Sequence, residues 1–125
     1  VGEREYVDGG VHSSTNLDLA ATLGFDLVIV SSAMTAAPGS RSWITDPSRA
    51  WFSSKLDDEV AEVRARGTAV LVVEPDGETL GDLDKTAAEA RANATNAGAA
   101  SVDRALSGSD GAGLTELIRR ATADQ

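Results

Sequence analysis

The residues with the clearest chemical potential lie in the turn Asp8-Gly9-Gly10, which follows the short strand candidate Glu5–Val7. Glycine permits positive φ and lets another group approach closely, so an aspartate beside two glycines can present its carboxylate in an open site. Such a carboxylate can act as a general base on a hydroxyl within hydrogen-bond reach, without an intervening histidine. Most Asp-Gly-Gly sequences are only turns, so the sequence context decides between the two interpretations.

The other polar residues near this turn have simpler structural interpretations. His12 is expected to be a solvated loop residue rather than a catalytic one, because a carboxylate base needs no histidine. Asn16 stands where a side chain caps the next helix, and this role is preferred to substrate contact. Asp57, Asp58 and Glu59 are expected to form a solvated acidic face near a helix start and not a metal site.

Residues 43–52 hold both tryptophans and one of the two phenylalanines of the chain. Two interpretations stay open for Trp43, Trp51 and Phe52. They are either core aromatics packed as a lid over a sheet, or contacts for an acyl chain or a lipid surface, since such side chains suit a half-lipid environment. The surrounding acidic residues do not favour binding to anionic membranes.

An alternation of strands and helices must position these groups. Two apolar, β-branched runs, 27–32 and 68–74, predict strands covered on both faces. Periodicity and helix-stop signals predict the helices 17–23, 52–66, 83–106 and 114–121. The first of these ends at Gly24, which suits a left-handed cap, and Gly67 ends the second. The alternation predicts an α/β fold with a mainly parallel sheet covered by helices.

Within the helix 52–66, an apolar stripe is expected to face the sheet: Phe52, Leu56, Val60 and Val63. The predicted strands are few for an α/β domain, whose sheets average about five or six. We therefore expect an exposed strand edge or apolar face that pairs with another chain. The partner would be a second copy, in a homo-oligomer or swapped assembly, or an N-terminal segment that completes the sheet.

Composition excludes several classes of function. The 125 residues contain no cysteine and one histidine, which rules out disulfides and argues against a structural zinc site. The net charge of -9 argues against nucleic-acid binding, which needs a basic patch. No apolar run approaches the ~18 residues of a membrane-spanning helix. No cofactor is expected.

The order of features in residues 6–20 (YVDGGVHSSTNLDLA) resembles the C-terminal part of bacterial patatin-like phospholipases. Residues 60–76 and the alanine-rich segment after them are also similar to the end of actinobacterial members. The resemblance implies a three-layer α/β/α fold and a Ser-Asp dyad that hydrolyses carboxylic esters of lipids. Carried onto this sequence, the dyad aspartate is Asp8, and Gly9 and Gly10 shape its turn.

The chain lacks the other half of that dyad. The resemblance places the serine in a Gly-x-Ser-x-Gly elbow upstream of the aspartate, and this motif does not occur in the 125 residues. Because Ser13, Ser14, Ser31 and Ser32 have no flanking glycines, none is expected to be the nucleophile. We therefore expect residues 1–125 to be the C-terminal part of a single patatin-like domain, inactive alone.

Two hypotheses follow from the sequence. In the first, the parent protein is a serine hydrolase of the phospholipase A type, acting in the cytoplasm or peripherally at a membrane. In the second, the chain is a small non-enzymatic α/β binding or interaction module in which Asp8 is only a turn residue. The module hypothesis expects a complete sheet with protected edges, so the state of the sheet distinguishes the two.

Overall fold

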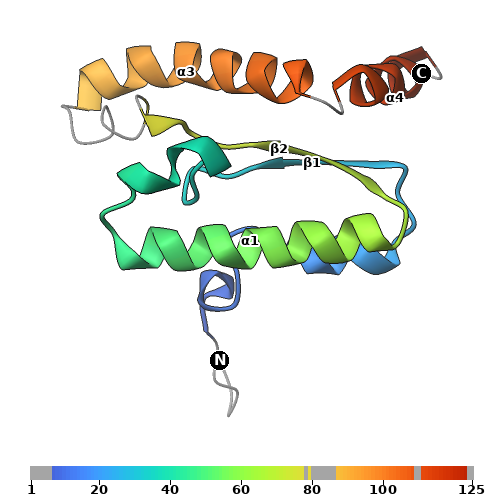
Figure 1. The fold of residues 1–125 in the computed structure, drawn as a ribbon, viewed down its shortest axis with the longest axis horizontal. Coiled ribbons are helices and arrows are strands. Elements are labelled where there is room, and N and C mark those ends of the chain that lie inside the picture. The colour runs from blue at the N-terminus through green and yellow to red at the C-terminus, as the bar shows by residue number, and fades with distance from the viewer. Residues whose placement is uncertain (1–6, 78, 80–86, 109–110, 124–125) are drawn as a thin grey trace, which may run out of the picture.

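The chain is built around a two-stranded parallel sheet (Figure 1). The computed structural model describes residues 7–77, 79, 87–108 and 111–123. Strand β1 (Leu27–Ser31) pairs with β2 (Ala69–Val73), with Leu27 opposite Ala69 and Ser31 opposite Val73. Both strands lie within the runs predicted from their β-branched residues. The structure therefore confirms the predicted α/β class and the parallel pairing of these two strands.

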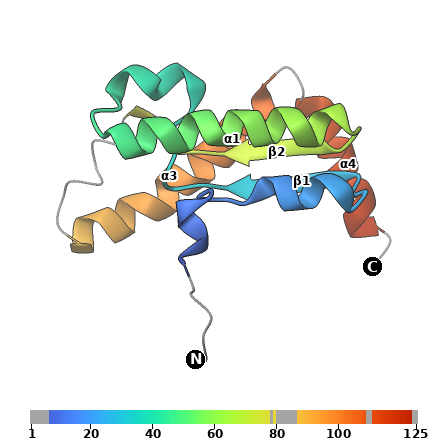
Figure 2. The ribbon, with the colours of Figure 1, turned by 90° about the horizontal axis from the view of Figure 1, so that it is seen from below.

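Helices lie on both faces of the sheet (Figures 1 and 2). On one face lies α1 (Pro47–Ala65), with the 3-10 helix η2 (Leu17–Thr22) packed beside it. On the opposite face lie α3 (Ala87–Ser107) and α4 (Gly111–Ala123). The predicted helices are therefore confirmed in place, although the first is a 3-10 helix rather than an α-helix. The linking segments contain two further 3-10 helices, η1 (Gly9–Val11) and η3 (Pro38–Trp43).

Local sequence explains where α1 begins and ends. The helix starts at Pro47 rather than at the predicted Phe52, because Asp46 caps it by accepting a 2.8 Å hydrogen bond from the Ser48 N–H. Proline at the first position has a φ preset for a helix. Gly67 follows the end of the helix, as predicted, and its φ of 92° is a left-handed conformation that favours glycine.

The core lies between α1, η2 and the inner face of the sheet. Its buried members are Leu17, Ala21, Val30, Leu56, Val63 and Val70. Leu56 and Val63 of the predicted stripe are 2% and 0% exposed. Val60 packs against this cluster, while Phe52 is only half-buried. The helical periodicity of the sequence therefore located the face of α1 that packs on the sheet.

The two strands differ in how well they are covered. Val70 and Leu71 of β2 are adjacent and both buried, so both faces of this strand are covered, as predicted. In β1, Val30 is buried, but Ile29 is 58% exposed and Ser31 is exposed. The expectation that β1 is covered on both faces is wrong for the part of the chain that the structure describes. One face of β1 is open there.

Some sequence predictions fall partly beyond the described ranges. In the strand predicted at 5–7, residues 5 and 6 lie outside them, and Val7 is in no strand. The start of the helix predicted from residue 83 also lies outside them, and α3 continues unbroken through Gly98. Helix α4 begins at Gly111, earlier than the predicted residue 114.

Among the helices that the structure describes, none combines the length and apolar character needed to cross a membrane.

Candidate functional site

Asp8 lies at the start of η1 with its carboxylate exposed. Its Oδ1 accepts a 2.9 Å hydrogen bond from the Gly10 N–H, which fixes the carboxylate over the turn. A Cβ atom at Gly10 would lie 3.3 Å from this oxygen, so glycine provides the space that the carboxylate occupies. Neither Gly9 nor Gly10 has a positive φ, contrary to expectation. These glycines contribute the absence of a side chain to the turn, and not a left-handed backbone.

Asp8 borders an open hollow of about 750 Å³. The other residues around the hollow are mainly apolar or small: Gly10, Val11, Ser14, Met34, Pro47, Ser48, Trp51 and Phe52. Trp51 is 49% exposed and packs edge-to-face on Phe52, with ring centroids 5.0 Å apart. The side chain of Trp43 lies outside the described part of the structure. The hollow therefore brings Asp8 together with two of the three aromatic residues for which core packing and lipid contact were both left open.

The hollow lies beside the carboxyl end of β1. Met34 belongs to the segment that follows β1, and Pro47 and Trp51 belong to the first turns of α1. Ligands of open α/β sheets bind at the carboxyl ends of the strands. The position of the hollow is therefore the one expected for a binding site in this class of fold.

The polar loop after η1 is organised by Ser13 rather than by Asn16. The buried Ser13 Oγ accepts hydrogen bonds from the N–H groups of Thr15 (3.1 Å) and Asn16 (2.9 Å). Asn16 occupies the N-cap position of η2 with a φ of 49°, but its side chain makes no cap and donates to the Ser13 carbonyl instead. The predicted capping role of Asn16 is therefore wrong. The left-handed backbone turns its side chain back towards the loop.

The residue that sequence analysis missed is Glu59 of α1. It was expected on a solvated face, but it is only 2% exposed. Its Oε2 accepts hydrogen bonds from the Thr15 hydroxyl (2.9 Å) and from the Leu17 N–H (3.0 Å) at the start of η2. The helical spacing of the sequence could have indicated that Glu59 is buried, because residue 59 lies three positions after Leu56 and four before Val63, on the buried stripe.

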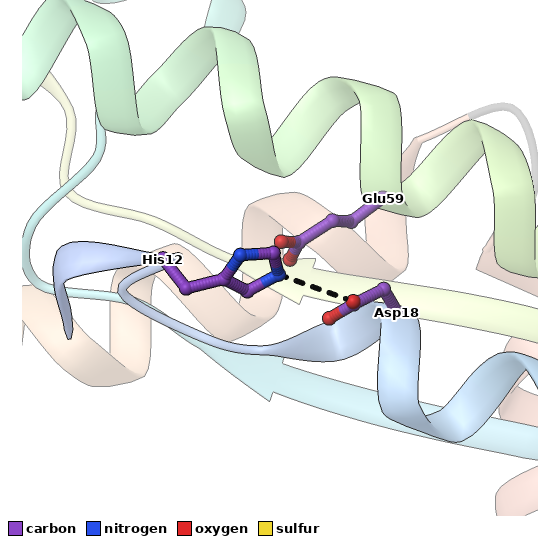
Figure 3. A group of neighbouring side chains, drawn as sticks. All are labelled: His12, Asp18 and Glu59. Carbon is purple, nitrogen blue, oxygen red and sulfur yellow. Dashed lines mark hydrogen bonds and ion pairs between the residues drawn. The ribbon is translucent and has the colours of Figure 1, made fainter. Parts of the chain in front are cut away.

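His12, Asp18 and Glu59 form a cluster between the loop and α1 (Figure 3). The His12 Nε2 lies 3.3 Å from the Asp18 Oδ2, and one donor atom from each residue lies within 4.8 Å of the others. The Glu59 Oε1 and the Asp18 Oδ1 are buried and have no hydrogen-bond partner in the part of the chain that the structure describes. The expectation that His12 is simply solvated is incomplete, since its exposed ring faces two carboxylates.

A further polar group lies just beyond the ends of the strands. Ser32 and Thr35, after β1, are buried. Within the described residues, their hydroxyls and the Glu74 Oε1 after β2 have no hydrogen-bond partner. Desolvation raises the pKa of Glu74, and the nearby Thr35 hydroxyl and then the positive charge of Arg41 oppose this shift. These side chains were not identified from the sequence, because isolated polar residues at strand ends carry no motif.

No family model matches the chain, and searches of curated proteins and of solved structures give no match either. Its function is therefore inferred from Asp8, from the hollow beside it and from the resemblance of the sequence around it.

Proposed function

We propose that the chain is the aspartate-bearing part of a patatin-like serine acyl hydrolase with a three-layer α/β/α fold. The observation that carries this proposal is the position of the Asp8 carboxylate on the rim of a hollow that Trp51, Phe52 and Met34 line. A carboxylate beside an apolar wall suits an ester whose acyl chain is buried while its carbonyl stays near a base.

In the proposed reaction, a serine from a segment outside these 125 residues attacks the carbonyl carbon of a lipid ester. Asp8 accepts the hydroxyl proton as the new C–O bond forms, and the alcohol leaves with that proton. Asp8 then takes a proton from water as the water oxygen attacks the acyl carbon. The bond from that carbon to the serine oxygen breaks, the serine oxygen takes the proton back from Asp8, and the fatty acid is released. The Gly10 N–H holds the Oδ1 atom, which leaves the Oδ2 atom to accept the proton.

The open face of β1 also supports the proposal. In the described ranges each strand has a neighbour on one side only, and Ile29 in the middle of β1 is 58% exposed. An edge of this kind is completed by further strands, from a preceding segment or from a second copy of the chain. A freestanding module is expected to cover its sheet, so this edge favours the enzyme-part hypothesis over the binding module.

A serine-directed probe tests the proposal. The longest natural polypeptide that contains this chain should be labelled by a fluorophosphonate on one serine, within a Gly-x-Ser-x-Gly sequence located by peptide mass spectrometry. The 125-residue chain alone should neither be labelled nor hydrolyse p-nitrophenyl butyrate. Hydrolysis by the 125-residue chain, or an unlabelled natural polypeptide, would contradict the proposal.

The aromatic wall of the hollow gives a second prediction, which can be checked on the chain itself. Trp51→Ser should weaken the binding of decanoate, measured by calorimetry, about tenfold, because losing the aromatic wall removes on the order of 1.4 kcal/mol of apolar contact. Phe25→Ser is the matched control, since Phe25 is also 49% exposed but does not line the hollow. Equal affinities of the two variants would exclude the hollow as the acyl site.

A further inference from the structure

Two buried carboxylate oxygens near His12 have no hydrogen-bond partner among the described residues. Glu59 is only 2% exposed, and its Oε2 atom is held by Thr15 and Leu17, whereas its Oε1 atom is one of the two unpaired oxygens. The other is the buried Asp18 Oδ1 atom, although 28% of the Asp18 side chain as a whole is exposed. Buried charged oxygens without partners are costly, so a native structure normally supplies a donor or a cation.

No protein cation in the described cluster fills this role. The basic group in the cluster is the His12 ring, whose Nε2 atom faces the Asp18 Oδ2 atom (Figure 3). Neutral imidazole and carboxylates together are ligands for first-row divalent metals. We propose that His12, Asp18 and Glu59 bind one divalent transition metal ion, of which Zn²⁺ is the test case, with water in the remaining position.

The geometry is close to that required. In a tetrahedral zinc site, metal–donor distances of about 2.0–2.2 Å place two ligand atoms roughly 3.3–3.6 Å apart. One donor atom from each of the three residues already lies within 4.8 Å of the others. Binding would contract the longest of these distances by about 1 Å. The His12 and Asp18 side chains, 60% and 28% exposed, have room to move. Glu59 is instead fixed by its hydrogen bonds and would anchor the site.

Metal binding would have a structural consequence that is independent of the proposed hydrolase. His12 immediately follows η1, Asp18 lies in η2 and Glu59 lies in α1, so one ion would link three separate elements. The ion would therefore hold the Asp8 turn against α1. Because it binds the folded arrangement of the ligands, it should also raise the melting temperature of the chain.

The single histidine of the chain makes this inference directly measurable. In an NMR titration of the 125-residue chain, Zn²⁺ should shift the ring signals of His12 and saturate at one equivalent. Calorimetry should give the same stoichiometry. The proposal would be overturned if the His12 signals did not move at saturating Zn²⁺, or if Zn²⁺ uptake did not saturate at one equivalent. Either result would indicate only adventitious binding to an acidic protein.

Variants then identify the ligands. His12→Ala and Glu59→Gln should each weaken Zn²⁺ binding at least about tenfold, since removing even supporting groups around a metal costs that much. Asp58→Asn, an exposed carboxylate next to Glu59, is the matched control and should bind as the unmodified chain does. Circular dichroism checks that each variant is folded. Unchanged affinity of His12→Ala would overturn the assignment.

Discussion

If the proposed hydrolase activity is found, asparagine in place of Asp8 is expected to lower kcat/KM for a p-nitrophenyl ester by about 10²–10⁴-fold, the contribution typical of a general base. The amide oxygen of asparagine can still accept the hydrogen bond that the Gly10 N–H donates to the Asp8 Oδ1. The turn should therefore keep its shape, while the group that accepts the serine proton is lost. Steady-state kinetics on the natural full-length polypeptide provide the measurement.

The control for this experiment is Asp26→Asn. Asp26 is exposed, precedes β1 and does not line the hollow, so its change should leave kcat/KM within about twofold of the starting value, as for substitutions away from the site. Retention of more than a tenth of the activity by Asp8→Asn would show that Asp8 is only a turn residue. Equal losses in both variants would indicate a general effect of charge instead.

The order and position of the elements followed from the sequence because the signals there are local. Runs of β-branched residues located β1 and β2, and Gly24 and Gly67 have φ values of 68° and 92° where helices were expected to stop. Helix starts were less accurate. The caps that fix them, such as Asp46 for α1, act through single side chains outside the apolar pattern.

Covering of the strands could not be predicted from the runs alone. β1 and β2 have equally apolar sequences, yet only β2 has adjacent buried residues. Coverage depends on which helices pack over each strand, and this is a property of the tertiary arrangement. A continuous apolar run indicates that a strand needs cover on both faces, not that the described part of the chain provides it.

The site was predicted in parts. Asp8 and the pair Trp51 and Phe52 were each identified from residue type, but only the fold shows that they share one hollow. Glu59 was assigned to solvent with its acidic neighbours, because the charge run was given more weight than the helical spacing from Leu56 to Val63. A zinc site was considered unlikely because only histidine and cysteine were counted as ligands, whereas the candidate ligands include two carboxylates.

Glu59→Ala is expected to lower the free energy of unfolding by about 2–4 kcal/mol. The change removes the acceptor of the Thr15 hydroxyl and of the Leu17 N–H. It leaves the Leu17 N–H unpaired in a buried site, and the Thr15 hydroxyl keeps only its 3.3 Å contact with the Ser13 Oγ. It also opens a cavity in a helix face that packs on the core. Since folded domains are stable by about 5–15 kcal/mol, this is a large fraction of the total. Urea unfolding with a metal chelator present gives the measurement.

Two further variants separate the hydrogen bonds from the charge. Glu59→Gln keeps an oxygen that can accept both hydrogen bonds, so it should lower the free energy of unfolding by less than about 1 kcal/mol. The bonds to a neutral amide are weaker than those to a carboxylate, but an amide also costs less to bury. Asp58→Ala, at an exposed neighbouring position, should stay within about 0.5 kcal/mol. If Glu59→Ala were as stable as the unmodified chain, desolvation of the carboxylate would cancel its bonds in the apo protein. The residue would then depend on a bound cation to stabilise the fold.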